Sequence, residues 1–162
     1  MAPIDIPLVI VGGGPAALVA AKIASGSGLT SLIAGYTMVG GEEPIDLDES
    51  SVQLLEPHGV LGILTPYASS TDPFAITPRL FEEVLKHHCV VDMNVTVYDE
   101  MELIDISPNG EGVTAVMTDG RSQWDVHADA FLGAGGFPTD PNGAIHAGAT
   151  AATEILSRLH PH

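Results

Sequence analysis

The sequence predicts an α/β fold in three layers, with a parallel sheet, covering helices and a small antiparallel β-meander. The first observation is the segment 8–24, in which the apolar run Leu8–Val11 precedes three glycines and an alanine-rich stretch. Such a segment is typical of a buried strand, a tight turn and a helix. The second observation is a period of two in the apolar residues after Cys89, interrupted by Asn-Gly and Asp-Gly turn signals. A chain of 162 residues with 45% hydrophobic residues is expected to form one domain, 1–162.

The composition limits the possible partners. The chain carries 21 acidic and 5 basic residues, and its net charge of −16 repels nucleic acid and anionic membranes. We interpret this charge as a general adaptation for solubility rather than as a device that steers a basic partner. No apolar run reaches the ~18–20 residues of a membrane span, and the N-terminus lacks the basic region of a signal peptide. The single Cys89 excludes an internal disulfide, so we expect a cytoplasmic protein without membrane insertion.

The turn after the first strand matches the dinucleotide-binding pattern G-x-G-x-x-G/A at Gly12, Gly14 and Ala17. Gly12 permits the sharp turn, and Gly14 has no side chain between a ligand phosphate and the backbone. The small Ala17 lets the helix pack close to the strand, and Pro15 suits the first helical turn. The free amides and positive dipole end of the helix then face an anion. A purely structural strand–turn–helix is the alternative that these residues leave open.

The second parallel strand is predicted at Leu29–Ala34, which completes a right-handed βαβ unit. An acidic residue near the end of this strand normally binds the ribose hydroxyls of the adenosine. This chain has Gly35 and Tyr36 there, so the carboxylate is missing. Tyr36 either stacks on an adenine or is a partly buried tyrosine of the core.

The middle region, residues 37–76, is predicted to be largely irregular, with a short helix within Val52–Leu64. A long region of this kind in a compact domain is often a binding segment. Its acidic loop follows Gly40-Gly41 and lacks the spacing of a calcium site.

A helix is predicted to begin at Thr77-Pro78, with Thr77 as its N-cap and Glu82 and Glu83 near its positive end. Cys89 is expected to begin the following strand as a buried, unreactive thiol. The run His87-His88-Cys89 has no further ligand at zinc spacing, so we expect no metal site.

The second half is predicted to contain an antiparallel meander at about 101–128, followed by an apolar strand, Asp129–Ala134, and a last helix, His146–Leu159. The small face of this helix allows close approach to another backbone. Its N-terminus is expected to point toward the same edge of the sheet as that of the first helix, which favours a pyrophosphate site.

This order of elements resembles the FAD-binding domain of the two-dinucleotide-binding-domain flavoproteins, especially the thioredoxin reductase-like branch of the pyridine nucleotide-disulfide oxidoreductases. The resemblance rests on the glycine turn in 9–21, on Gly40-Gly41, and on the segments 77–97, 113–136 and 142–156. It implies FAD as the cofactor, held along its pyrophosphate by the glycine turn. It also implies that Ala134-Gly135-Gly136 matches the A-x-G-D strand end and that Ala144–His146 form the turn into a helix facing the flavin. The predicted cofactor-binding residues are Gly12, Gly13, Gly14, Pro15, Ala16, Ala17, Gly35, Tyr36, Gly40, Gly41, Gly135, Gly136, Asp140, Ala144, Ile145 and His146.

Three departures from that family matter. The ribose carboxylate is absent, and Gly136 stands where the family has the aspartate of the ribityl chain; Asp140 is the candidate substitute. The chain leaves no room for the NAD(P)H domain that the family inserts between the meander and the last strand. The redox cysteine pair is also absent, so the protein is not a complete thioredoxin reductase.

The sequence therefore predicts a minimal FAD-binding flavoprotein, oxidoreductase-like, that receives electrons from a protein partner or a small donor. No residue is a convincing catalytic acid or base, although His146 is the best candidate to lie near a flavin. The alternative is a structural or regulatory subunit that kept the fold and lost the cofactor, with a partner or a second copy covering its open face. A third possibility is an adenine-nucleotide binder without redox chemistry.

Overall fold

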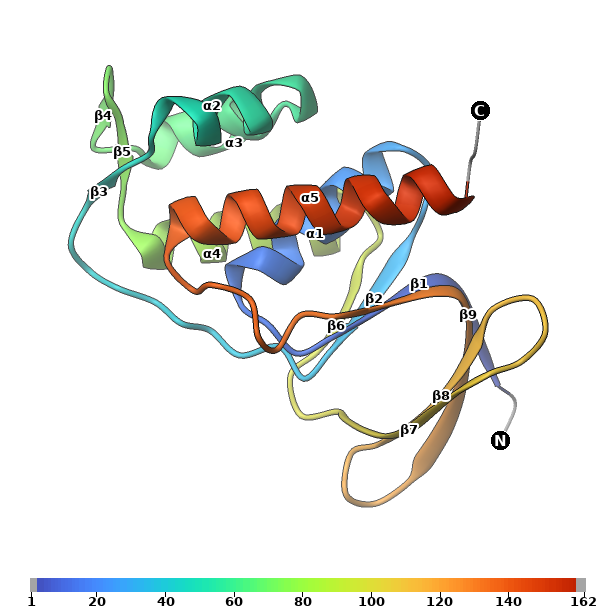
Figure 1. Ribbon diagram of the computed structural model, residues 1–162. Coiled ribbons are helices and arrows are strands. Elements are labelled where there is room, and N and C mark those ends of the chain that lie inside the picture. Colours follow the sequence, from blue (N-terminus) through green and yellow to red (C-terminus); the bar gives the residue numbers. More distant parts are fainter. Residues whose placement is uncertain (1–2, 160–162) are drawn as a thin grey trace.

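The computed structural model describes residues 3–159 and places three long helices on one face of a six-stranded sheet (Figure 1). The sheet order is β6-β2-β1-β9-β8-β7, in which β6, β2, β1 and β9 run parallel and β9, β8 and β7 run antiparallel. The strands are β1 (Ile4–Val11), β2 (Ser31–Ala34), β6 (Thr96–Tyr98), β7 (Glu102–Pro108), β8 (Val113–Thr118) and β9 (Gln123–Gly133). This is the α/β fold with a parallel sheet and a small meander that the sequence predicts.

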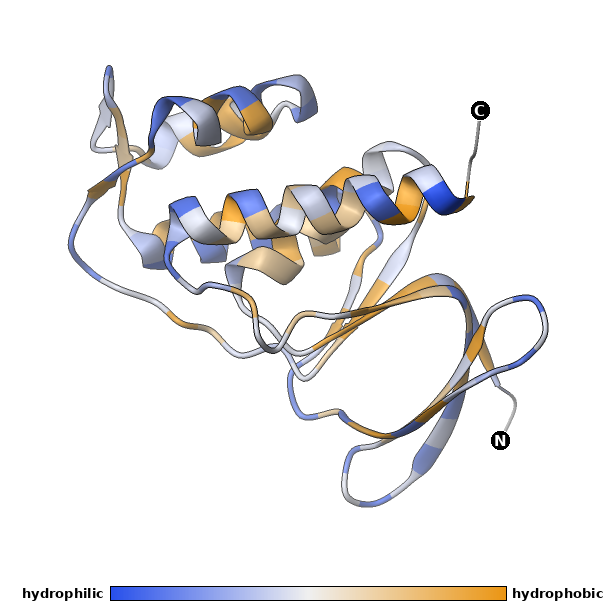
Figure 2. Ribbon diagram, viewed as in Figure 1, coloured by the Kyte–Doolittle hydropathy of each residue, from blue (hydrophilic) through white to orange (hydrophobic). Residues whose placement is uncertain are grey.

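Strand β1 is apolar on both faces because both faces are covered. Leu8 and Ile10 belong to the core beneath the helices, whereas Val9 belongs to a second core on the meander side with Met117 and Val126. Alternate side chains of a strand point to opposite faces, so an unbroken apolar run is needed where both are buried. Helices, parallel sheet and meander therefore form three layers, and the two turns of the meander are hydrophilic (Figure 2).

Strand β9 joins the parallel and antiparallel parts of the sheet without interruption. It pairs with β8 over 123–128 and with β1 over 126–133. The prediction of two separate strands in this stretch, at 123–127 and 129–134, is wrong. No glycine or proline lies between them, so nothing ends the extended backbone. The meander therefore leads directly into the last parallel strand.

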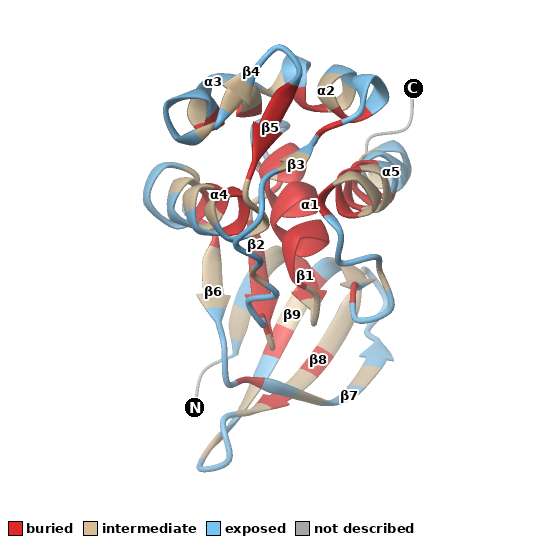
Figure 3. Cartoon of the chain, turned by 90° about the vertical axis from the view of Figure 1, so that its left-hand side faces the viewer, coloured by how far each residue is buried: buried red, intermediate tan, exposed pale blue. Residues whose placement is uncertain are grey.

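Helices α1 (Pro15–Gly26) and α4 (Pro78–Asp92) cover the sheet, and residues 15–24 of α1 are all buried (Figure 3). Thr77 caps α4 as predicted, since its Oγ1 accepts a hydrogen bond of 3.2 Å from the amide of Leu80. The expectation that Cys89 begins a strand is wrong, because α4 continues to Asp92. Phe81, Leu85 and Cys89 are all fully buried and recur every four residues, which keeps the helical stripe intact through Cys89.

Helix α5 (Pro141–Leu159) begins five residues earlier than predicted. Asp140 caps it: its carboxylate accepts from the amide of Gly143 at 2.8 Å, and its carbonyl accepts from that of Ala144 at 2.8 Å. Pro141 is tolerated in the first turn, where no backbone donor is needed. Ala144–His146 are therefore helical and do not form a turn.

The middle region is more regular than expected. It contains α2 (Glu49–Leu55), α3 (Val60–Leu64), two 3₁₀ turns (Glu56–His58 and Thr65–Tyr67) and a small antiparallel sheet of β3 (Ile45–Asp46), β4 (Ser70–Thr71) and β5 (Phe74–Ile76). The helix expected within 52–64 is present as two short helices, separated around Pro57 and Gly59. Figure 1 shows this unit stacked on the helix layer, away from the sheet.

None of the helices described between residues 3 and 159 is long and apolar enough to cross a membrane.

Candidate dinucleotide-binding site

The carboxyl ends of β1, β2 and β9 bring the predicted glycines together at one edge of the sheet. Val11 pairs with Ala34 of β2 and with Gly133 of β9, so the residues that follow these strands meet there. The amide of Gly12 donates to the carbonyl of Ala34 at 2.7 Å, and the amide of the next residue, Gly35, donates to the carbonyl of Tyr98 of β6 at 2.8 Å. The edge has the position at which ligands bind in open α/β sheets.

Gly12 forms the sharp turn that the glycine motif predicts at this position. Its φ is +79°, and a Cβ at this position would lie 3.1 Å from the Cα of Gly135. Gly13 is equally restricted, since a Cβ there would lie 2.9 Å from the Cβ of Ala17. The small residues at 12, 13 and 17 are therefore required by packing of the protein on itself, whether or not a ligand binds.

The start of α1 offers backbone donors. Within residues 3–159, the amides of Ala16 and Ala17 form no hydrogen bond to a backbone or side-chain acceptor. Both residues are buried, and Pro15 has no amide hydrogen. Two unbonded amides at the positive end of a twelve-residue helix suit an anion.

Gly14 does not face open space. A Cβ on this residue would lie 2.8 Å from Cγ2 of Val39 and 3.4 Å from the carbonyl oxygen of Thr37. We name Thr37–Gly41 the cover segment, because it crosses the glycine turn at this point. The amide of Thr37 also donates to the carbonyl of Gly13, at 3.3 Å.

Glu82 of α4 holds the cover segment. Its carboxylate accepts from the amide of Gly40 at 2.7 Å and from that of Val39 at 3.1 and 3.2 Å. The hydroxyl of Tyr36 donates to the same carboxylate at 2.9 Å, and Glu82 is only 1% exposed. The sequence pattern placed Glu82 merely near the positive end of α4. Its position three residues before Leu85 and seven before Cys89 was the available signal for a buried side chain.

Tyr36 is a core tyrosine in this structure. Its residue is 3% exposed, and the ammonium of Lys86 lies 4.9 Å from the ring centroid. Burial, followed by the charge of Glu82 and the hydrogen bond to it, raises the pKa of the Tyr36 hydroxyl far above its ordinary value. The ring is therefore packed inside the protein and is not presented to an adenine.

Gly40 and Gly41 continue the cover segment toward α4. Gly40 has φ +75°, and a Cβ on it would meet no atom within 4 Å, whereas a Cβ on Gly41 would lie 3.0 Å from Cγ of Pro78. The carbonyl of Gly41 accepts from the amide of Arg79 at 3.0 Å. The segment is thus fixed at both of its ends.

The remaining predicted residues separate into three groups. A Cβ on Gly135 or Gly136 would meet no atom within 4 Å, so both face open space at the edge. Ala144 and Ile145 are fully buried. Asp140 caps α5, and His146 Nε2 lies 2.9 Å from Oγ of Ser50 in α2. We conclude that His146 has a structural contact here.

Three features of this edge suit the phosphates of a dinucleotide: the unbonded amides, the small side chains, and the open space at Gly135-Gly136. It does not fit at Gly14, where the side chain of Val39 lies in the place that the motif keeps free for a phosphate. A ribose carboxylate is also missing after β2.

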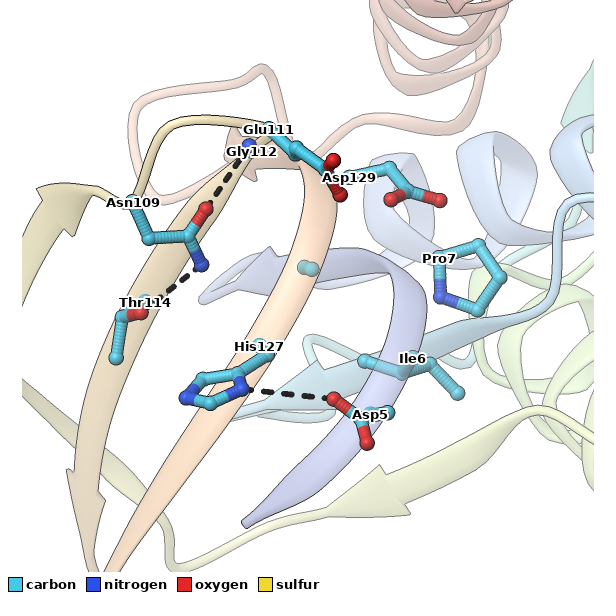
Figure 4. Close-up of a pocket in the computed structure, with 10 residues that line it drawn as sticks. Asp5, Ile6, Pro7, Asn109, Glu111, Gly112, Thr114, His127 and Asp129 are labelled. Carbon is cyan, nitrogen blue, oxygen red and sulfur yellow. Dashed lines mark hydrogen bonds and ion pairs between the residues drawn. The ribbon is translucent and has the colours of Figure 1, made fainter.

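A separate pocket of about 590 Å³ lies at the start of β1, beside the β7–β8 turn (Figure 4). Asp5, Glu111 and Asp129 line it together with His127, whose Nδ1 is 3.5 Å from Oδ1 of Asp5. None of the predicted site residues lines this pocket. Three carboxylates make it unsuited to phosphates, so we do not assign the dinucleotide to it.

Comparison with solved structures identifies the fold. The chain is similar to the rebeccamycin biosynthetic enzyme RebC with reduced flavin (TM-score 0.64, 16% identity, 82% of this chain and 33% of that one). It is also similar to the OxyS anhydrotetracycline hydroxylase from Streptomyces rimosus (TM-score 0.63, 17% identity, 80% and 31%). A third match is the flavin-dependent monooxygenase PieE in complex with FAD and substrate (TM-score 0.58, 20% identity, 80% and 30%).

These matches show a fold shared with FAD-dependent flavoproteins. No family model matches the sequence, and no curated protein matches it. The chain spans about a third of the length of the solved structures named above. The thioredoxin reductase-like branch suggested by resemblance stays a prediction.

Proposed function

We propose that this chain is an FAD-binding domain with an oxidoreductase-like role, which works with a protein partner or a diffusing electron donor in the cytoplasm. The observation that carries the proposal is the edge at which the Gly12 turn, the unbonded amides of Ala16 and Ala17, and Gly135-Gly136 meet. The fold shared with RebC, OxyS and PieE supports it, because RebC and PieE are described with flavin.

In this proposal the chain binds and orients the cofactor through its backbone. The amides of Ala16 and Ala17 would hold the pyrophosphate, and Gly135-Gly136 would let the ribityl part approach the end of β9. Bound FAD would supply electron or hydride transfer, which no side chain at this edge supplies. The finer assignment to the thioredoxin reductase-like branch is part of the proposal and rests on the resemblance alone.

The continuity of β9 supports the proposed dependence on a partner. Since the meander enters the last parallel strand without a break, no nicotinamide-binding domain is inserted there. We therefore propose that the reducing equivalents come from outside this domain. A homo-oligomer or a heteromeric complex would bring such a donor to the glycine edge.

A cofactor-free structural or regulatory subunit is the second candidate. Val39 on Gly14 and the two missing carboxylates favour it. The turn residues would then be retained for the packing of Gly12 on Gly135 and of Gly13 on Ala17.

The first test is the visible absorption spectrum of the purified protein, with mass spectrometry of any released ligand. Flavin bands with FAD released are the expected result. A colourless protein that also fails to bind added FAD would favour the cofactor-free subunit, and the next experiment would then be a search for its partner by co-purification.

A gain-of-function variant sharpens this test. Gly136→Asp restores the carboxylate that the resemblance places on the ribityl chain, at a position with open space around it. Hydrogen bonds to a charged group contribute about 1.5–3 kcal/mol, so FAD should bind about tenfold or more tightly. Gly62→Asp adds the same charge at an uncrowded glycine of α3 and serves as the control. If the two variants bind FAD equally, the flavin does not lie at the end of β9.

A further inference from the structure

We propose that Glu82 is a latch that holds the cover segment closed over Gly14, so that a dinucleotide phosphate reaches the start of α1 only when Val39 and Gly40 leave the Glu82 carboxylate. This inference rests on the proposed function and adds a means of regulating the same site. Two independent observations support the latch. The side chain of Val39 lies against Gly14, and the buried Glu82 carboxylate accepts hydrogen bonds from the backbone amide of Val39.

The latch is built from a fully paired buried carboxylate. Glu82 receives hydrogen bonds from two backbone amides and one hydroxyl, all from residues 42 to 46 positions earlier in the chain. A buried charge is stable only when such partners are present, so the carboxylate and the cover segment depend on each other. Because the cover segment and the adjoining Tyr36 supply all three donors, the position of this stretch and the pairing of Glu82 change together.

The outer face of the same segment is exposed to solvent. Met38 is 38% exposed and Val39 is 47% exposed, although both are apolar. Gly35 precedes the segment with φ +71°, and Gly40 (φ +75°) and Gly41 (φ +132°) end it; glycine adopts such backbone conformations readily, whereas other residues resist them. Glycines on both sides of Met38 and Val39 give the backbone the freedom that a second position of the cover segment requires.

The charge of Glu82 opposes phosphate binding while the cover segment is closed. The Oε1 atom of Glu82 lies 3.5 Å from the position that a Cβ on Gly14 would take, next to the backbone that the motif offers to phosphate. A carboxylate there repels a pyrophosphate, and it does so without occupying the amides of Ala16 and Ala17. Only the fraction of molecules with an open segment would bind, which lowers the apparent affinity by that fraction.

Glu82→Gln, Val39→Ala and the control Glu83→Gln test the latch. Glutamine has one acceptor oxygen, so its amide group must face a backbone or hydroxyl donor, and the carboxylate charge is lost. Val39→Ala removes the atoms above Gly14 and leaves the backbone hydrogen bonds in place. Glu83→Gln changes the same charge on the adjacent, solvent-accessible side chain of α4. The measurements are FAD affinity by titration and amide hydrogen exchange at Val39 and Gly40.

If the latch exists, Glu82→Gln binds FAD at least about tenfold more tightly than the wild type and Glu83→Gln, and exchange at Val39 and Gly40 becomes faster. Val39→Ala also binds FAD more tightly, with unchanged exchange, and it keeps the test valid should Glu82→Gln fold poorly. A wild type that binds FAD while Glu82→Gln and Val39→Ala bind it no more tightly overturns the latch and leaves the proposed function standing. Absence of FAD binding in all four proteins, with faster exchange in Glu82→Gln, overturns the proposed function and the latch together.

Discussion

Helix α5 makes two contacts that differ in chemistry and in depth. Near its middle, Gly148 packs against α1 so closely that a Cβ there would lie 2.5 Å from the carbonyl oxygen of Ala16. Near its N-terminus, Asn142 and His146 form hydrogen bonds with residues 46–50, just before and at the start of α2. Asn142 accepts from the amide of Asp48 at 2.9 Å and donates to the carbonyl of Asp46 at 3.1 Å, in solvent-accessible positions.

The difference shows how firmly each contact of α5 holds the element it meets. The α1–α5 contact is buried and close, so it holds the first helix against the last and keeps the glycine turn in place. The Asn142 and His146 contacts are hydrogen bonds near water, where each contributes only about 0.5 kcal/mol, the lower end for a hydrogen bond. The polar contact of α5 with the start of α2 is therefore weaker than its contact with α1, whereas the unit formed by α2, α3 and the small sheet is also held by Leu55, Leu64 and Ile76, which are buried in the main core.

Gly148→Ala is expected to have the largest effect. The added methyl group would overlap the Ala16 carbonyl, and backbone cannot yield as a side chain can. Overpacking of this kind lowers the free energy of unfolding by about 2–3 kcal/mol, despite the better helix propensity of alanine. Urea unfolding followed by circular dichroism measures it. Gly62→Ala in α3, where a Cβ would meet no atom within 4 Å, should leave stability unchanged or slightly increased. Equal stability of the two variants would contradict the close α1–α5 contact.

Gly12→Ala is expected to come next. Its φ of +79° costs an alanine about 1–2 kcal/mol, and the new Cβ would also press on Gly135. Gly136 at the same edge does not have a positive φ and faces open space, so Gly136→Ala should show little change in the same unfolding experiment. Comparable losses in both variants would mean that the whole edge is packed, and that the open space proposed for the ribityl chain does not exist.

Asn142→Ala should affect the weaker contact by about 1 kcal/mol, because two hydrogen bonds near solvent are lost. The loss should be local, so limited proteolysis is expected to cut within 46–58 sooner, while global unfolding changes little. Asn109→Ala removes comparable bonds from the β7–β8 turn and leaves cleavage at 46–58 unchanged. A loss of global stability without new cleavage at 46–58 would contradict the local character of this contact.

The same contrast explains what the sequence could predict. The strand–turn–helix of 8–24, the Thr77 cap and the meander are recognised from residues close together in the chain, although 8–24 also packs against β9 and α5. Glu82 was missed as a functional residue because all its partners are more than 40 positions away. The start of α5 was misplaced because Pro141 and Gly143 are typical of a turn, and only the Asp140 cap shows that they belong to a helix.

The glycine motif illustrates the limit most clearly. Sequence spacing predicts that Gly12 turns the chain, and its positive φ agrees with that role. Spacing also predicts that Gly14 faces a ligand, yet Val39 from the segment after β2 lies there. A pattern of glycines shows where side chains are absent, but not which atoms fill the space. At Gly14 that depends on the position of residues 37–41 in the fold, and nothing in the sequence of 12–17 predicts this position.

Asp48→Ala tests the smallest effect, at the polar contact of α5 with α2. Asp48 is the N-cap of α2. A hydrogen bond from the backbone amide of Ser51, followed by one from the Ser50 hydroxyl and by the nearby His146, holds the pKa of the Asp48 carboxyl below its ordinary value of 3.8. A lowered folded-state pKa means that the carboxylate stabilises the fold above the unfolded value and that this stability is lost as the pH falls through the folded value. The melting temperature of the wild type should therefore exceed that of Asp48→Ala near neutral pH, and the gap should close in acid. A gap that stays constant from about pH 7 to below about pH 3 would show that the ionised cap does not contribute. In that case the packing of α2, and not the charge at its N-terminus, holds this unit against α5.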